Sequence, residues 1–410
     1  MEMKRKYFAI FLFLWVFLII ITGCEYKIPQ AIWQPQGKGT PNPIISQVDP
    51  PRWAFAGVTS IKITGQNFSE NVENNSVYFN NKRGTILSCT PTEILVKAPY
   101  LKELIKDSLK IQISVEKAYL PAIYFPYQLK EASVLYGDFD SHLDVIFSIA
   151  VDANEDVYAM MKGKTVVKIS PNGTKDEEWG STVFPKASQM RVGPDGYLYL
   201  QRSNNQSLYR IAPEGGKTVE WVKVDKKVRF FDFDEYHNIY LGGTVSGIFV
   251  VYPDGTYKAT NMYEDYDIKA IRVYDNYLYV LAYYKGSDIN IPSRGIWRSR
   301  ISDAQGNLTN PELVVDWSTT GNYAAVEFYD LTFASDGDMY VGTAYRDPIL
   351  VVHPDGSTEP LYPGTLIPDA DQLVWGNANY MYVNRTGSSE IRNLVRIDMN
   401  KEGAIYYGRR

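Results

Sequence analysis

Three stretches of the chain decide the fold: FSIAVDANEDVYAM (147–160), SQMRVGPDGYLYLQ (188–201) and RFFDFDEYHNIYLG (229–242). Each joins an apolar run to a Tyr-bearing run through a short polar segment, which is the pattern of two strands and a tight turn. The same pattern recurs in KAIRVYDNYLYVLA (269–282), YDLTFASDGDMYVG (329–342) and DQLVWGNANYMYVN (371–384). Six units of this kind indicate a repeat protein.

The Tyr that the six units share recurs about every 40 residues, except after the longer fourth unit, where the spacing is 61 residues. It falls at Tyr158, Tyr199, Tyr240, Tyr279, Tyr340 and Tyr382. Most units are followed by a second turn signal, SPNGT, APEGG, YPDGT or HPDGS, in which Pro fixes φ and Gly accepts a positive φ. A period near 40 residues with about four strands per repeat is typical of a β-propeller. We therefore predict a six-bladed β-propeller over residues 131–410.

The six units resemble NHL repeats, and VLYGDF before the first unit is similar to the strand that precedes a blade in that family. Two segments compete to close the last blade, Val134 to Gly137 and Ala404 to Gly408. The fourth repeat is longer and carries YYKGSDINIPSRG between its second and third strands. Such an insertion lies in a loop on one face of a propeller, where loops often bind ligands.

Residues 43–130 alternate short Val/Ile/Tyr runs with Gly, Asn and Pro turns, as in SIKITG, NSVYFN, TEILVKAP and LKIQISV. This period-2 pattern predicts a β-sandwich. The segment resembles the IPT/TIG family of Ig-like domains at Pro43, Pro50, Gly57, Gly65, Asn67, Phe68 and Pro99. Such domains serve as spacers, dimerisation units and receptor modules, and we expect a spacer. The predicted fold class is all-β, an Ig-like (IPT/TIG) sandwich followed by a six-bladed propeller.

The N-terminus has the features of an export signal. Lys4-Arg5-Lys6 precedes an apolar run, Phe8 to Ile21, that is shorter than the about 20 residues of a membrane-spanning helix. We therefore predict a signal peptide over residues 1–23. The following ITGC resembles a bacterial lipobox, which implies that Cys24 carries a lipid, although an uncleaved membrane anchor stays an alternative.

Residues 24–42 are rich in Pro, Gly and Gln and predict a flexible tether. Glu25 follows the lipobox Cys in place of the Asp that retains some lipoproteins at the inner membrane. We therefore expect a protein of the cell envelope, an outer-membrane lipoprotein that is periplasmic or surface-exposed. Its membrane partner would be the bilayer that holds the lipid anchor.

Composition excludes several function classes. The chain has 42 Lys and Arg against 47 Asp and Glu, a formal net charge of −5, so it offers no basic footprint for nucleic acid. It has only 3 His and 2 Cys, which supply a zinc site or a Cys–His nucleophile poorly, and we expect neither metal nor cofactor. With Cys24 acylated, Cys89 has no partner for a disulfide and is expected to be a small buried residue.

A binding face is expected where the inner strand of each blade begins, because that face collects the loops that enter the blades. Its loops combine aromatic rings, which stack on sugars, with planar polar groups, which bind hydroxyls. The alternative is that loop Tyr residues cover blade edges and loop charges are merely solvated. The candidate ligand-binding residues are Arg202, Tyr283, Tyr284, Arg294, Trp317, Tyr323, Tyr345, Arg346, Asp347 and Arg385.

The sequence offers few candidate catalytic residues. The expected channel-entrance positions contain one carboxylate, too few for a divalent metal site: Ser148, Gln189, Phe231, Ala270, Asp330 and Gln372. We predict a binding protein for a polysaccharide or glycoconjugate, without catalysis. One alternative is a scaffold for another envelope protein. The other is a hydrolase or lyase that uses His142 and Asp330, while His237 and His353 are expected to be structural.

Overall fold

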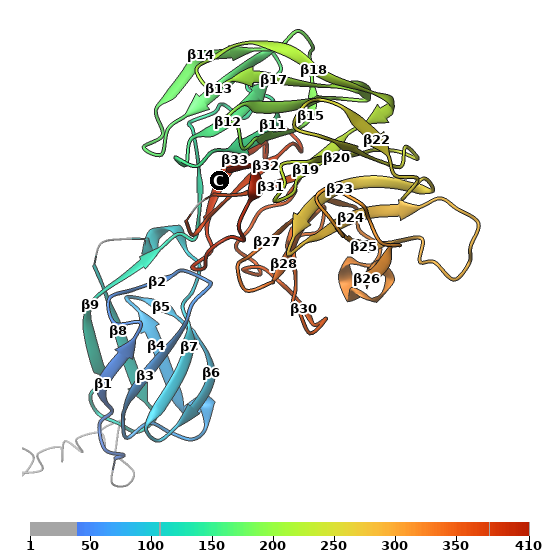
Figure 1. The fold of residues 1–410 in the computed structure, drawn as a ribbon. Helices are drawn as coiled ribbons and strands as arrows, with labels where there is room; N and C mark the ends of the chain where they lie inside the picture. The colour runs from blue at the N-terminus through green and yellow to red at the C-terminus, as the bar shows by residue number, and fades with distance from the viewer. Residues whose placement is uncertain (1–38, 106–107, 377, 410) are drawn as a thin grey trace, which may run out of the picture.

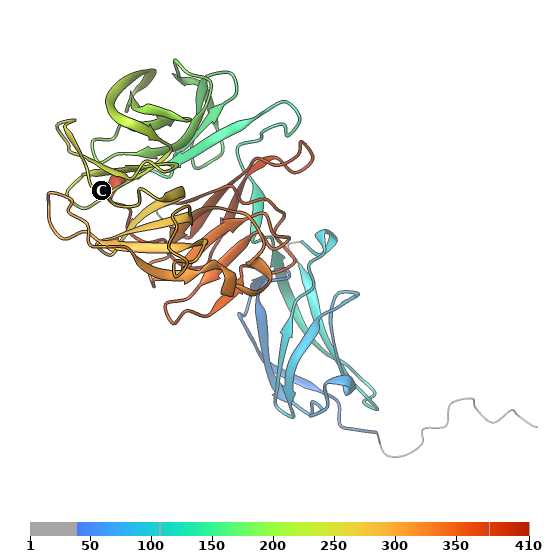
Figure 2. The same cartoon turned by 90° about the vertical axis from the view of Figure 1, so that its right-hand side faces the viewer.

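A computed structural model describes residues 39–105, 108–376 and 378–409 of the chain. The predicted signal peptide (1–23), Cys24 and most of the predicted tether (24–42) lie outside the described residues. The described chain forms two bodies made of strands, a sandwich and a propeller, with the sandwich projecting from the rim of the propeller (Figure 1, Figure 2). The predicted fold class is confirmed. No helix within these ranges is long and apolar enough to cross a membrane.

The sandwich consists of two sheets whose inner faces meet. One sheet has the order β1 (Ile44–Asp49), β3 (Ser60–Gln66), β7 (Glu93–Lys97), β6 (Thr85–Thr90). The other has the order β2 (Trp53–Phe55), β9 (Ala122–Lys130), β8 (Leu109–Val115), β4 (Asn75–Phe79), β5 (Lys82–Arg83). Alternate residues point inward, as Ile61 and Ile63 do in β3, so the period-2 pattern becomes a core. Cys89 is half-buried against this core, and its Sγ donates to the Glu70 carbonyl at 3.3 Å.

Each propeller blade is a four-stranded antiparallel sheet. Blade 1 contains β11 (Ile146–Val151), β12 (Val157–Met161), β13 (Thr165–Ile169) and β14 (Lys175–Ser181). Blade 2 contains β15 (Ala187–Val192), β16 (Leu198–Arg202), β17 (Asn205–Ala212) and β18 (Gly215–Val228). Blade 3 contains β19 (Phe230–Phe233), β20 (Ile239–Gly242), β21 (Ile248–Val251) and β22 (Tyr257–Ala259). The outer strands β14 and β18 also pair in parallel, which joins blades 1 and 2 at the rim.

The remaining blades complete the ring. Blade 4 contains β23 (Tyr266–Tyr274), β24 (Tyr277–Tyr284), β25 (Arg294–Arg300) and β26 (Glu312–Asp316). Blade 5 contains β27 (Phe328–Phe333), β28 (Met339–Thr343), β29 (Ile349–Val352) and β30 (Thr358–Pro360). Blade 6 contains β31 (Gln372–Trp375), β32 (Tyr380–Arg385), β33 (Asn393–Asp398) and β10 (Ser133–Leu135).

The strand β10 closes the propeller, because it comes from the start of the repeat region and pairs with β33 of the last blade. Val134 lies opposite Arg396 in this antiparallel pair. Of the two predicted closing segments, the one that begins at Val134 is therefore correct. The other, Ala404 to Gly408, is not a strand of a blade. Its Ala404 amide instead donates to the Phe333 carbonyl at 3.0 Å, on blade 5.

The Tyr shared by the six repeats is buried in every blade. In the first three blades its hydroxyl donates to an Asp in the turn that joins the first two strands of the same blade. These pairs are Tyr158 with Asp152 at 2.9 Å, Tyr199 with Asp195 at 2.8 Å and Tyr240 with Asp234 at 3.0 Å. The chain has 32 Tyr. Those shared by the first three blades therefore have a structural role, because they stabilise the turns within these blades.

Polar side chains on the inner strands link neighbouring blades. Each accepts a backbone N–H from the next inner strand: Gln189 from Phe231 at 2.6 Å, Asp232 from Val273 at 2.8 Å, Asp330 from Leu373 at 3.0 Å and Gln372 from Ile149 at 3.0 Å. A buried amide without such a partner would cost free energy. Three of the expected channel-entrance residues thus stabilise the ring.

The sandwich is tied closely to the propeller. Only Glu131 and Ala132 separate β9 from β10, and the Ala132 carbonyl accepts the Asp398 amide at 2.8 Å. A second contact involves Gly57, where an added Cβ would lie 2.9 Å from Cγ2 of Thr365 in the propeller. The connection between the two bodies is therefore short and hydrogen-bonded.

Candidate functional site: a cavity at the mouth of the propeller channel

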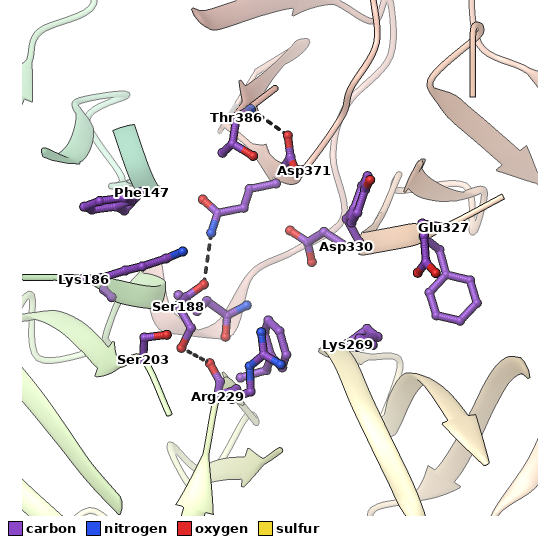
Figure 3. A pocket seen from close by; sticks show the side chains of 16 residues that line it. Phe147, Lys186, Ser188, Ser203, Arg229, Lys269, Glu327, Asp330, Asp371 and Thr386 are labelled. Carbon is purple, nitrogen blue, oxygen red and sulfur yellow. Dashed lines mark hydrogen bonds between the residues drawn. The ribbon is translucent and has the colours of Figure 1, made fainter. Parts of the chain in front are cut away.

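The propeller has a cavity of about 320 Å³ on the face where the inner strands begin (Figure 3). This is the face on which the sequence predicted binding. All six blades contribute to its lining: Phe147, Lys186, Ala187, Ser188, Gln189, Ser203, Arg229, Phe230, Lys269, Glu327, Phe328, Tyr329, Asp330, Asp371, Gln372 and Thr386. Half of these residues stand at or just before the first residue of an inner strand, and most of the others lie within its first four residues, so the starts of the strands fix their positions.

The floor of the cavity consists of groups that also hold the blades together. Ser188 donates its hydroxyl to the Arg229 carbonyl at 2.6 Å, and Gln372 donates from Nε2 to the Ser188 carbonyl at 3.1 Å. Asp330 accepts the amides of Leu331 at 2.9 Å and Leu373 at 3.0 Å. Burial raises the pKa of Asp330, and both amide bonds oppose that rise. The floor is therefore polar but internally hydrogen-bonded.

Acidic groups from blades 5 and 6 form one wall of the cavity. The Tyr283 hydroxyl donates to the Glu327 carboxylate, and the Thr386 amide donates to Asp371 Oδ2 at 2.7 Å. Burial raises the pKa of Asp371. Burial, with the charges of nearby carboxylates, raises the pKa of Tyr329 to about 12, so its hydroxyl remains a hydrogen-bond donor at neutral pH.

Basic groups from blades 2, 3 and 4 form the opposite wall. Lys269 Nζ lies 3.1 Å from Asp267 Oδ2 and is paired. Lys186 Nζ lies 5.2 Å from the ring centroid of Phe147, and the Arg229 guanidinium carbon lies 5.4 Å from that of Phe230. Neither Lys186 nor Arg229 forms an ion pair with any residue that the structure describes.

The far end of the channel is filled by the C-terminal segment. Tyr406 is buried there beside Arg191 and Arg272, where the remaining space is only about 10 Å³. Both guanidinium groups pair with Asp232, at 3.4 Å from Arg191 Nε and 3.2 Å from Arg272 Nη1. A small ligand therefore has access to the channel from the cavity side.

None of the ten ligand-binding residues predicted from the sequence lines this cavity. Several of the aromatic ones instead belong to the core between blades 4 and 5. Trp317 is 0% exposed, and its Nε1 donates to the Tyr323 carbonyl at 2.9 Å. Tyr323 is also buried; its hydroxyl donates to the Asp347 carbonyl at 2.7 Å, and its ring lies 4.7 Å from that of Tyr345. Trp317 and Tyr323 are thus inaccessible to a ligand, because the two short 3-10 turns between β26 and β27 pack them into this core.

The polar members of the predicted set have structural partners or lie beside the cavity. Arg294 donates to the carbonyls of Ala324 at 2.8 Å and Val326 at 3.2 Å. Arg346 is exposed and lies 3.5 Å from Asp347. The other members are Arg385, which is buried, and Arg202, Tyr283 and Tyr284, which are half-buried.

Sequence reasoning missed Lys186, Arg229, Phe230, Tyr329 and Asp371. A signal for them exists, since they stand at the boundary between the loop that enters a blade and the first residues of its inner strand. In repeats two to six, a charged residue that lines the cavity stands 10 to 13 residues before the shared Tyr. This short region marks the channel mouth more directly than the loops between the second and third strands.

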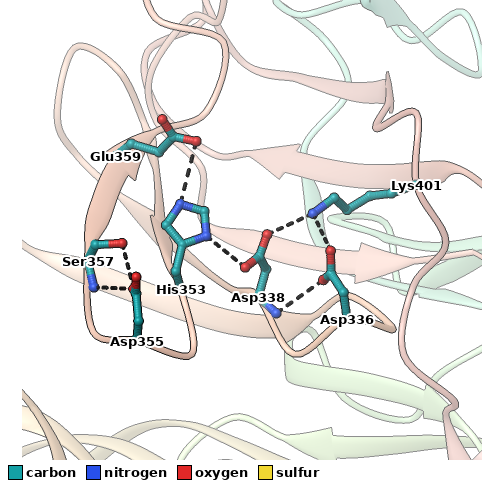
Figure 4. Close-up of polar contacts among 7 residues, drawn as sticks. All are labelled: Asp336, Asp338, His353, Asp355, Ser357, Glu359 and Lys401. Atoms are coloured by element: carbon teal, nitrogen blue, oxygen red, sulfur yellow. Dashed lines mark hydrogen bonds and ion pairs between the residues drawn. The ribbon is translucent and has the colours of Figure 1, made fainter.

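The histidines do not assemble an acid–base pair at the cavity. His142 is exposed, in a turn where its amide donates to Asp140 Oδ1 at 2.8 Å, and it does not line the cavity that Asp330 lines. His353 Nδ1 lies 2.7 Å from Asp338 Oδ1, and Lys401 bridges Asp336 and Asp338 at 2.7 Å each (Figure 4). Over the described ranges, no group of three or more His, Cys, Asp or Glu side chains is placed to hold a metal ion.

Comparison with known proteins supports the two-part architecture. The IPT/TIG domain family matches residues 43–128. No curated protein sequence matches the chain. An auxiliary nutrient binding protein from Bacteroides thetaiotaomicron is similar in structure, with a TM-score of 0.51, 13% identity, and coverage of 89% of this chain and 98% of that one. A protein from the same organism, provisionally assigned as a phosphatase, has a TM-score of 0.54, 13% identity and the same coverage.

A third similar structure is virginiamycin B lyase from Staphylococcus aureus, with a TM-score of 0.44, 14% identity, and coverage of 65% of this chain and 98% of that one. At identities this low, the two Bacteroides structures with TM-scores above 0.5 indicate the fold alone. The sequence match identifies residues 43–128 as an IPT/TIG domain. The chain thus joins an IPT/TIG domain to a C-terminal six-bladed β-propeller.

Proposed function

We propose that this chain is a lipid-anchored binding protein of the bacterial cell envelope, and that its propeller cavity takes a glycan or glycoconjugate without breaking a bond. The observation that carries the proposal is the lining of the cavity. Half-buried rings of Phe147, Phe230 and Tyr329 stand beside hydroxyl and amide groups on a rigid ring of strands. Aromatic faces with a few fixed polar groups are the usual means of binding a sugar ring. The auxiliary nutrient binding protein with the same fold supports a binding role.

Calorimetric titration of the exported protein with neutral and acidic oligosaccharides tests the proposal. Phe147→Ala removes a ring from the cavity and is expected to weaken glycan binding about tenfold, since a ring contact contributes about 1.5 kcal/mol. Phe139→Ala is the matched control. Phe139 is also half-buried and also lies under a lysine, Lys175 at 4.8 Å, but it is outside the cavity. Equal affinities for the two variants would show that sugars bind elsewhere.

The lipid anchor is a separate part of the proposal and has its own test. The native protein should incorporate labelled palmitate, and Cys24→Ala should abolish that incorporation. Because the apolar run from Phe8 to Ile21 stays intact in this variant, membrane fractionation of the variant alone does not separate the two kinds of anchor. A native protein that stays in the membrane fraction without incorporating palmitate would instead indicate an uncleaved anchor.

A role as a scaffold for another envelope protein is the second candidate, and it rests on the sandwich. Ile123 and Phe125 in β9 are 56% and 65% exposed, and Leu120 in the preceding loop is 64% exposed. Exposed apolar side chains that cluster in this way are typical of protein contacts. Crosslinking in intact cells, compared between the native protein and a Phe125→Ser variant, tests this role independently of the cavity.

A further inference from the structure

We propose that the ligand of the cavity is an acidic glycan, whose carboxylate or sulfate group binds between Lys186 and Arg229. This inference rests on the proposed glycan-binding function and specifies the class of sugar. It follows from the charges around the cavity, from the way two of them are oriented, and from the charge of the whole chain.

Most of the charged groups of the cavity already have partners within the protein. Glu327 accepts the Tyr283 hydroxyl, and Asp371 accepts the Thr386 amide. Asp330 accepts two backbone amides of the floor. Lys269 pairs with Asp267. The acidic wall therefore has much of its hydrogen-bonding capacity satisfied before a ligand arrives.

Lys186 and Arg229 differ from these groups, because neither lies within ion-pair distance of a carboxylate among the described residues; the charge of Arg229 acts on Asp267 only from farther away and helps to lower its pKa. They lie on adjacent blades, and both side chains extend into the cavity (Figure 3). The backbone between them is fixed, since the Ser188 hydroxyl donates to the Arg229 carbonyl at 2.6 Å and the Ser203 amide donates to the Lys186 carbonyl at 3.0 Å. Two cations on a fixed backbone form a site for an anion.

Each cation also lies over an aromatic ring that belongs to the cavity. Lys186 lies over Phe147 at 5.2 Å, and Arg229 lies over Phe230 at 5.4 Å. These cation–π contacts hold the charged groups themselves beside rings that line the same cavity. A sugar that stacks on either ring would bring a carboxylate or sulfate substituent to the adjacent cation. The guanidinium group can bind both oxygens of such an anion, while the ammonium group adds a point charge.

The overall charge of the chain argues that this attraction is local. With a formal net charge of −5, the protein as a whole repels polyanions. An acidic glycan would therefore bind through these two side chains and not through a general basic surface. Its neutral ring faces would meet the phenyl rings, and its hydroxyls could donate to Glu327 and Asp371 on the opposite wall.

The decisive experiment compares acidic sugars with their uncharged counterparts. The exported protein is titrated with oligogalacturonate, hyaluronan and chondroitin sulfate oligosaccharides, and with the methyl esters or desulfated forms of the same oligosaccharides. At least one acidic oligosaccharide should bind, and its uncharged form should bind at least about tenfold more weakly. Raising the salt concentration should weaken binding of the acidic form alone, because salt screens charges.

Two variants link this preference to the proposed residues. Lys186→Gln and Arg229→Gln should each lower affinity for the acidic form about tenfold, and should change affinity for the uncharged form much less. Lys175→Gln is the matched control, because Lys175 also lies over a phenylalanine, Phe139, but outside the cavity. Thermal unfolding of each variant checks that the fold is retained, as expected for side chains at a cavity rim.

The possible results separate this inference from the proposed function. Equal binding of acidic and uncharged forms, or binding of neutral oligosaccharides alone, overturns the inference and leaves glycan binding in place. Acidic binding that survives the Lys186→Gln, Arg229→Gln double variant also overturns it, because the acid then binds elsewhere. Failure of every oligosaccharide, with capture of an oligoglutamate peptide at the cavity, overturns both and indicates an acidic protein ligand.

Discussion

The guanidinium carbon of Arg191 lies 5.7 Å from the ring centroid of Tyr406, which places the last residues of the chain against blade 2. Arg272 of blade 4 lies 5.3 Å from the same ring. Lys401, earlier in the segment, bridges Asp336 and Asp338 of blade 5. The C-terminal segment therefore connects three blades across the far end of the channel, and several predictions about stability depend on it.

Removal of the Tyr406 ring should destabilise the propeller. The ring is buried, and its loss leaves a void beside two guanidinium groups. We expect Tyr406→Ala to lower the free energy of unfolding by about 3–5 kcal/mol, as for other large buried rings, and Tyr406→Phe to lower it much less. Urea denaturation followed by fluorescence measures the difference. Tyr236, which is 46% exposed, provides the control Tyr236→Ala, and equal midpoints for the two alanine variants would contradict the prediction.

The negative charge of Asp232 should be important for the stability of the propeller around its channel. It pairs with Arg191 and Arg272 while its Oδ2 accepts the Val273 amide at 2.8 Å. Asp232→Asn keeps an acceptor for that amide but leaves two buried cations without their charge partner. The expected loss is about 3–5 kcal/mol in the free energy of unfolding. Glu220→Gln, at an exposed position of β18, should change it little, and an equally small effect at Asp232 would show that the cations are compensated elsewhere.

His353 should make stability depend on pH. The hydrogen bond to Asp338 raises the pKa of His353 above its ordinary value of about 6.5. Its stabilising contribution is therefore fully present below about pH 6.5 and is lost as the pH rises through the folded-state pKa. The difference in thermal midpoint between the native protein and His353→Gln should shrink as the pH increases from 5.5 to 8.5. His142→Gln, at an exposed position, is the control, and a constant His353 difference would refute the assignment.

Closure of the ring by β10 should be needed for folding. A chain that begins at Glu131 retains β10 and should unfold cooperatively. A chain that begins at Gly137 lacks it and leaves the outer edge of β33 unpaired, so its thermal midpoint should fall by several degrees or its transition should broaden. Hydrogen exchange at the Asp398 amide, which donates to the Ala132 carbonyl at 2.8 Å beside this strand pair, reports the change directly. Identical transitions for the two chains would show that β33 does not need this partner.

The blades could be predicted because their signals are local. The buried Tyr and the turn Asp that it contacts lie within one hairpin, as Tyr158 and Asp152 do, so each repeat carries its own information. The closing strand could only be narrowed to two segments. The pairing of Val134 with Arg396 joins residues from opposite ends of the repeat region, and short-range patterns do not encode such a register.

The face of the candidate site could be predicted, but the residues in it could not. Topology alone places the loops that enter the blades on one face. Whether a loop aromatic is exposed depends on tertiary packing, and Trp317 and Tyr323 are buried against residues of blades 4 and 5. Lys186 and Arg229 look like ordinary solvated charges in the sequence. They become candidates for anion binding only in the folded protein, where they line the cavity and no carboxylate among the described residues lies within ion-pair distance of either.

The pairing of β10 with β33 also sets the order in which the molecule can be completed. Residues 133–135 leave the ribosome long before residues 395–397, so the sandwich can fold while β10 waits with an unsatisfied edge. The ring cannot close until residues 395–397 have been made, and contacts so distant in sequence form slowly. An unpaired strand edge is prone to wrong partners in that interval. This short segment is therefore exposed to wrong pairing until the final blade arrives.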